Sequence, residues 1–216
     1  MRNFLTIWKR ELTACFLSPV AYVTMVVYLA VCGGTFLFGV ERNVGTNQPV
    51  PSLLFAAVIT WMTVLVAVVS MRLFAEEKRQ GTLETLMTAP VTETEVVMGK
   101  YAGALTFLLV VSVPAVSNIY VLAAFNHGVH SVDAGSVIGG CLVLVMVSAF
   151  LLSIGLIISL MTRSQLIAAI CVFCAVWVVL LTGNIVALIP GGSGRLFDFI
   201  SLVSHIEDFS RGAIDT

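Results

Sequence analysis

A serine flanked by glycines near the C-terminus is the first candidate for chemistry. The run Gly191-Gly192-Ser193-Gly194 is similar in form to the turn that presents the nucleophile of an intramembrane serine protease. Such a nucleophile needs a base within hydrogen-bond reach. The histidines that could act as that base all fall outside the long apolar segments of the chain: His127, His130 and His205. We therefore interpret the glycines as a tight turn and predict no catalytic residue, so the chain is not expected to be an enzyme by itself.

Two histidines and an aspartate lie close together and could ligate a metal ion. His127 and His130 are three residues apart, and Asp133 follows them. The spacing across Gly128 is loose for a pair of ligands, and Asp133 is well placed to cap a helix that begins at residue 134. We expect a loop without a metal here, with a metal site as the alternative.

Nucleotide binding and thiol chemistry are both disfavoured. A phosphate-binding loop has the pattern G-x-x-x-x-G-K-[ST], and the one Gly-Lys pair, Gly99-Lys100, is followed by Tyr101. The chain therefore cannot bind ATP in that manner, and any ATP-derived energy must come from a partner. Cys171 and Cys174 have the spacing of a redox motif but sit in an apolar segment, where a thiolate is costly. We predict no cofactor bound by this chain.

These residues are carried by long apolar helices. The 216 residues are 59% hydrophobic and 11% charged, whereas a soluble domain is about 45–50% apolar and about 25% charged. Five uncharged apolar runs each exceed the roughly 20 residues that cross a bilayer, at residues 20–40, 51–71, 101–125, 134–161 and 164–190. The predicted fold is an all-α, polytopic integral membrane bundle. The net charge of −1 without a basic stripe excludes a nucleic-acid partner.

Residues 1–18 form an amphipathic segment ahead of the first span. Its apolar residues recur every four positions with charged residues between them: Phe4, Trp8, Leu12 and Phe16, with Lys9, Arg10 and Glu11. This pattern predicts an interfacial helix in contact with membrane lipid, ended by Ser18-Pro19. Eight Lys and Arg residues fall on the side of the N-terminus and three on the other side. The N-terminus is therefore expected in the cytoplasm.

The loop at residues 72–100 holds nine of the 23 charged residues of the chain. The run from Glu76 to Arg79 should extend the second span beyond the bilayer, and Gly81 should end that helix. Thr92 and Glu95 have the spacing of a capping box, which predicts the start of the next helix there. Between them, Thr82 can cap a short helix over residues 83–88, which Pro90 stops. Such a framed helix, with an apolar face beside charged residues, predicts a docking element.

The same loop resembles the permeases of ABC-2 type transporters. The run Arg72 to Leu86, followed by Ala89-Pro90, Glu95 and Gly99-Lys100, is similar to the family pattern R…A.E…GT.E.L…P followed by G-K. The Pro190 region and the run Ser204 to Gly212 resemble the branch linked to gliding motility and multicopper-enzyme maturation.

This resemblance implies a single permease domain over 1–216, in the bacterial cytoplasmic (inner) membrane. Its partners would be cytoplasmic ATPase subunits, which bind ATP and Mg, and a second permease, either a copy or a related chain. The residues implied to couple to the ATPase are Glu76, Glu77, Lys78, Arg79, Gly81, Thr82, Leu83, Glu84, Leu86, Met87 and Pro90.

Polar residues at membrane depth are the candidates for a substrate pathway. They lie near a predicted kink at Pro114 and in the last span: Ser112, Ser117, Asn118 and Asn184. The alternative is that they only bridge helices. No Asp, Glu, Lys or Arg lies inside the five spans, which argues against an ion-coupled carrier.

The family has six spans, and this chain shows five. Residues 191–216 are too interrupted to cross a bilayer and are expected to form an outer re-entrant or interfacial hairpin. The sixth helix is then expected to be removed from this chain or absent from a truncated member. The expected function is the permease subunit of an ATP-driven exporter. The alternative is a mechanotransmitting or scaffolding subunit that passes ATPase motion to an outer-face protein without transport.

Overall fold

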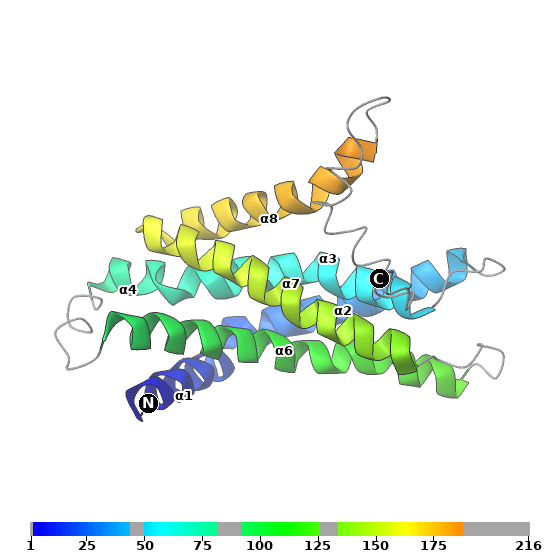
Figure 1. Ribbon diagram of the computed structural model, residues 1–216, viewed down its shortest axis with the longest axis horizontal. Helices are drawn as coiled ribbons and strands as arrows, with labels where there is room; N and C mark the ends of the chain where they lie inside the picture. The colour runs from blue at the N-terminus through cyan, green and yellow to red at the C-terminus, as the bar shows by residue number, and fades with distance from the viewer. Residues whose placement is uncertain (1, 44–49, 82–91, 126–133, 188–216) are drawn as a thin grey trace.

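The chain is helical throughout the parts that the structure describes. A computed structural model describes residues 2–43, 50–81, 92–125 and 134–187. The helices are α1 (Arg2–Leu17), α2 (Pro19–Arg42), α3 (Val50–Leu73), α4 (Ala75–Gln80), α6 (Glu93–Phe125), α7 (Ala134–Met161) and α8 (Gln165–Ala187), as Figure 1 shows. No strand occurs in these ranges. The predicted docking helix at 83–88 and the predicted hairpin at 191–216 lie outside the described residues.

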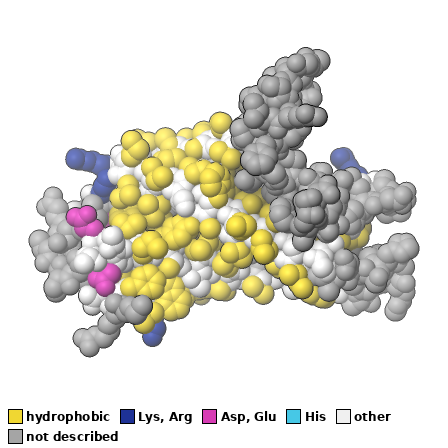
Figure 2. All heavy atoms as spheres, viewed as in Figure 1, with side chains coloured by type: hydrophobic (Ala, Val, Ile, Leu, Met, Phe, Trp, Pro, Cys, Tyr) yellow, Lys and Arg dark blue, Asp and Glu magenta, His cyan; other side chains and the backbone are white. Residues whose placement is uncertain are grey.

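In the described residues, four helical segments are long and apolar enough to cross a membrane: Pro19–Arg42, Val50–Gln80 (α3 with α4), Glu93–Val121 and Gly135–Met161. Helix α8 is also apolar and has 23 residues, or about 34 Å at 1.5 Å per residue. Hydrophobic side chains cover the middle of the bundle, with charged ones toward its ends (Figure 2). The prediction of an all-α polytopic membrane protein is confirmed.

Helix α3 lies at the centre of the bundle. It packs against α2, α6, α7 and α8 (Figure 1), and buried side chains occur on nearly all of its faces, among them Leu54, Phe55, Val58, Met62 and Val66. Helix α2, in contrast, buries few of its residues: Tyr28, Cys32 and Phe36. The remaining apolar surface of α2 faces outward, which is stable in lipid and would not be in water.

Close helix approach depends on two glycines of α7. A β-carbon at Gly140 would lie 2.1 Å from Cε2 of Phe55, and one at Gly155 would lie 2.6 Å from Cβ of Ser70. Small residues at such crossings let two helix backbones approach closely. Gly140 and Gly155 therefore set the separation between α7 and the central α3.

The predicted amphipathic helix forms as α1, and Ser18 with Pro19 separates it from α2 as expected. Its apolar side packs against α6. Trp8 Nε1 donates a hydrogen bond to Thr106 Oγ1 at 3.1 Å, and the rings of Phe16 and Phe107 meet edge to face with centroids 5.1 Å apart. Helix α1 is thus docked on the protein.

Candidate functional site at the basic end of the bundle

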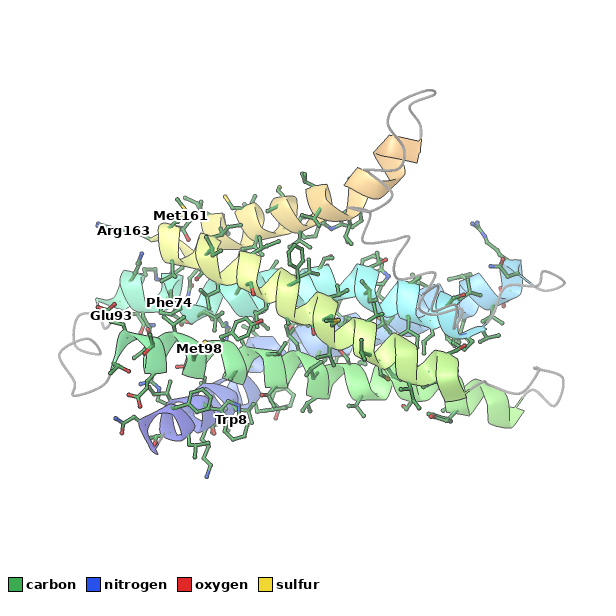
Figure 3. The ribbon with its side chains drawn as sticks, viewed as in Figure 1. Trp8, Phe74, Glu93, Met98, Met161 and Arg163 are labelled. Carbon is green, nitrogen blue, oxygen red and sulfur yellow. The ribbon has the colours of Figure 1, made fainter. Side chains whose placement is uncertain are left out.

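The charged side chains gather at one end of the bundle. This end contains α4, the first turns of α6 and the turn between α7 and α8, and Figure 3 labels Glu93 and Arg163 there. We call it the basic end and define it by Lys9, Arg10, Arg72, Lys78, Arg79, Lys100 and Arg163. Arg42 is in the last turn of α2, at the opposite end (Figure 1).

A break at Phe74 separates α3 from α4. The two amides at the break, those of Phe74 and Ala75, both donate hydrogen bonds to Ser159 Oγ on α7, each at 3.2 Å. Lys78 on α4 donates through Nζ to the carbonyl of Leu160, near the C-terminus of α7, where a positive charge is favourable. These contacts join α4 to α7.

Gly81 ends α4 in the left-handed conformation, with φ +70°. Its amide donates to the carbonyl of Lys78 at 3.4 Å. Glycine adopts this conformation without the steric cost of a β-carbon, and it commonly ends helices. The sequence predicted that the helix after the second span ends at Gly81, and α4 ends there.

The other side of the loop begins with a capping box. The amide of Thr92 donates to Glu95 Oε2, and the amide of Glu95 donates to Thr92 Oγ1, both at 3.3 Å. These reciprocal bonds satisfy two amides that have no helical partner at the start of α6. The bond from the Thr92 amide lowers the pKa of the Glu95 carboxyl below its usual range. The capping box predicted from the sequence is present.

We expect the start of α6 to loosen at acid pH. Because the folded-state pKa of Glu95 is depressed, its stabilising contribution is complete above the unfolded pKa, and it is lost as the pH falls through the folded value. Hydrogen exchange of the amides at residues 93–97, corrected for intrinsic rates, should show this loss. Glu95→Gln should remove the pH dependence, and the neighbouring Glu93→Gln should leave it unchanged. An unaltered pH dependence in Glu95→Gln would contradict the assignment.

A buried lysine connects three elements at the basic end. Lys100 on α6 is 1% exposed, and its Nζ lies 2.8 Å from Glu77 Oε1 on α4 and 3.1 Å from Glu11 Oε1 on α1. Arg10 pairs with the same two oxygens at 3.2 and 3.0 Å. The Lys100 ammonium also lies 5.3 Å from the centroid of the Phe74 ring. We call Arg10, Glu11, Glu77 and Lys100 the Lys100 cluster.

Two glycines bring α1 to the Lys100 cluster. A β-carbon at Gly99 would lie 2.8 Å from Cγ2 of Ile7, and one at Gly103 would lie 2.8 Å from Cβ of Glu11. Glycines four residues apart allow close helix contact. This contact was not predicted from the sequence, although the G-x-x-x-G spacing at residues 99–103 is the signal that could have indicated it.

Cys15 lies one helical turn beyond Glu11 on the docked helix. Its side chain is half-buried. Burial, followed by the neighbouring Glu11 carboxylate, raises the pKa of the Cys15 thiol to about 11. The thiol is therefore almost entirely protonated at neutral pH, which makes it a weak nucleophile while α1 is docked.

The described side chains among the residues predicted to couple to an ATPase fall into two groups. Glu77 and Lys78 point into the protein. Glu77 pairs with Lys100, and Lys78 bonds to α7. Arg79 is exposed, and Glu76, half-buried, accepts a hydrogen bond from Gln80 at 3.4 Å. The other predicted coupling residues lie outside the described part of the chain: Thr82, Leu83, Glu84, Leu86, Met87 and Pro90.

Two of the candidate pathway residues, Ser112 and Ser117, differ in their exposure. Ser112 is buried and donates to the Leu108 carbonyl at 2.8 Å, whereas Ser117 is exposed and donates to the Pro114 carbonyl at 2.7 Å. Asn118 is half-buried. Asn184 belongs to α8, and its side chain is outside the described part.

The candidate metal and nucleophile residues, His127, His130, Asp133 and Ser193, also lie outside the described ranges. Within those ranges no three His, Cys, Asp or Glu residues gather in a way that could hold a metal ion.

Comparison with known proteins decides the family. A family model described as ABC-2 type transporter matches residues 2–207. The chain belongs to the ABC-2 type transporter family. No curated protein matches it. As an ABC-2 permease it is a multi-pass membrane protein and a subunit for transport, of a family that generally works with ABC ATPase subunits. Its basic end contains the described residues of the motif that resembles the family: Arg72 to Gly81, Glu95 and Gly99-Lys100.

Proposed function

We propose that this chain is the permease subunit of an exporter in the bacterial inner membrane, driven by ATPase subunits that dock on the loop between α4 and α6. The observation that carries the proposal is the way this loop is held. It leaves α4 at Gly81 and joins α6 at the Thr92 cap, and the Glu77–Lys100 ion pair joins the two sides at 2.8 Å. A segment fixed at both ends can transmit force to the helices it connects.

The charge distribution supports a cytoplasmic position for this loop. Seven of the Lys and Arg residues in the described ranges belong to the basic end, and Arg42 lies at the opposite end. Short loops rich in Lys and Arg stay on the cytoplasmic side. We therefore propose that the N-terminus and the loop face the cytoplasm, where ATPase subunits are found.

A second permease, identical or related, completes the proposed transporter. The outward faces of α2 and α6 are apolar, with Val26, Phe38, Val113 and Tyr120 all well exposed. Ser117 and Pro114 lie on the exposed side of α6, so these faces would border a pathway only if another chain packs beside them. The pathway is accordingly proposed to form between two permeases.

Co-purification tests this function. The tagged chain, extracted in detergent, should retain its ATPase. Glu84→Lys and the double variant Leu83→Asp/Leu86→Asp should reduce retention at least about tenfold, because truncating or misplacing a charge in a buried interface costs about 2–5 kcal/mol. The control is Glu41→Lys, the same change of charge on an exposed residue at the opposite end. Failure of wild type to retain the ATPase would overturn the proposal.

A mechanotransmitting subunit is the second candidate function. It is favoured by the hydroxyls of Ser112 and Ser117, which bond to carbonyls of their own helix and form no common polar surface. ATPase activity of the complex in liposomes would distinguish the two functions. An exporter should respond to a transported solute, whereas a mechanotransmitter should respond to an outer-face protein.

A further inference from the structure

We infer that Lys100 joins α1 to the cytoplasmic loop, so that α1 moves with the loop when the ATPase acts; this inference rests on the proposed function. The ammonium of Lys100 is shared between Glu77, which precedes the loop, and Glu11, which belongs to α1. One buried side chain thus links the two sides of the loop to a helix that is almost ninety residues away in the sequence.

The burial of Lys100 makes this link strong. At 1% exposure the ammonium has almost no contact with solvent, and a buried charge that leaves its partners is left uncompensated. The cluster is balanced, since Arg10 and Lys100 face Glu11 and Glu77. The pairs of Arg10 contribute less, because its side chain is 53% exposed and screened by solvent. Displacement of Glu77 by a partner therefore removes one of the two carboxylates that compensate Lys100 and changes the forces that hold Glu11 and α1.

The packing of α1 makes the link rigid. Gly103 places Glu11 against α6, since any β-carbon there would lie 2.8 Å from that of Glu11. Trp8 bonds to Thr106, and Phe16 packs on Phe107. These contacts keep α1 against the first turns of α6 along much of its length. If α1 were only a lipid anchor, it would need no buried ion pair to the loop.

Cys15 provides a native reporter of α1 docking. It lies one turn beyond Glu11, half-buried on the docked helix. Undocking would expose the thiol and lower its pKa from about 11 toward the value of a free cysteine. Maleimides react with the thiolate. A decrease of 1 in the pKa of the Cys15 thiol would therefore raise the labelling rate by about tenfold. The rate of labelling therefore measures the position of α1.

The first experiment uses the full chain in membranes without any ATPase. The other cysteines are replaced by alanine: Cys32, Cys141, Cys171 and Cys174. Glu77→Gln, which keeps the shape of the side chain and leaves the Lys100–Glu11 pair in place, should speed N-ethylmaleimide labelling of Cys15 at least about threefold. Lys100→Met should speed the labelling of Cys15 at least about tenfold. Gly103→Ala should also speed this labelling, although it changes no charge. Glu41→Gln, on α2, should have no effect.

The second experiment uses the complex of the same chain with its ATPase. Trapping with Mg-ATP and vanadate should change the Cys15 labelling rate relative to the nucleotide-free complex, and Lys100→Met, at a buried position outside the residues expected to contact the ATPase, should abolish that difference while the ATPase stays bound. A Glu77→Gln chain that labels like wild type without ATPase overturns the inference. A complex that hydrolyses ATP without a change in the Cys15 labelling rate also overturns the inference. Loss of the ATPase from wild type would instead overturn the proposed function, and the first experiment would still decide whether α1 is linked to the loop.

Discussion

Lys100→Met is expected to lower the stability of the chain by about 3–5 kcal/mol, the usual cost of removing one partner from a buried ion pair. The substitution keeps an unbranched apolar side chain, one atom shorter than that of lysine, and removes the charge. It leaves Glu11 and Glu77 beside each other, with only the exposed Arg10 to balance two carboxylates. For a chain of this size, each kcal/mol shifts Tm by about 2–4 °C, so the shift should be about 6–20 °C.

The measurement is thermal unfolding in detergent, followed by the fraction of chain that remains monodisperse. The triple variant Lys100→Met/Glu11→Gln/Glu77→Gln also neutralises the two carboxylates. It should recover part of the lost stability because no unbalanced carboxylate stays buried. A single variant as stable as wild type would show that Lys100 is not held by its partners. A triple variant less stable than Lys100→Met would show that the loss does not come from uncompensated carboxylates.

Gly140→Ala is expected to destabilise the chain by about 1–3 kcal/mol, the usual cost of forcing an extra carbon into a filled core. The new β-carbon would lie 2.1 Å from Cε2 of Phe55. Phe55 is fully buried in α3, so its ring cannot move aside without displacing other core side chains. The helices α3 and α7 would have to separate.

Gly39→Ala is the matched control for this prediction. Gly39 also lies inside a helix, but a β-carbon there would meet no atom within 4 Å. Alanine in place of glycine inside a helix is favourable by about 0.5–1 kcal/mol, so this variant should be as stable as wild type or more so. Equal Tm values for Gly140→Ala and Gly39→Ala would contradict the packing described for α7.

The helices and their ends follow largely from local patterns in the sequence. Apolar runs without charges predict membrane helices because backbone groups in lipid must be paired within the segment. Pro19, Gly81 and the Thr92–Glu95 pair act through bonds with near neighbours. Such features need no knowledge of the tertiary structure, and the structure shows each of them.

The Lys100 cluster could not be predicted in the same way. Charges near a membrane border are usually in water or at lipid headgroups; Glu11 was expected among the charged residues of an interfacial helix, and Lys100 was expected in a charged loop. Their burial depends on a contact between α1 and α6 that Gly99 and Gly103 permit. Likewise, Glu77 and Lys78 were expected to face a partner, but Lys100 and the end of α7 lie within reach of them. Long-range contacts of this kind require the arrangement of the helices.

Photo-cross-linking from the loop would show whether the ATPase docks there. A photoreactive amino acid is placed at position 84 in the loop and, as a control, at position 43, the cap of α2 at the opposite end. Irradiation of membranes that contain the chain and its ATPase should give a covalent adduct from position 84 and none from position 43. Adducts from position 43, or none from position 84 although the ATPase is present, would contradict docking of the ATPase on this loop.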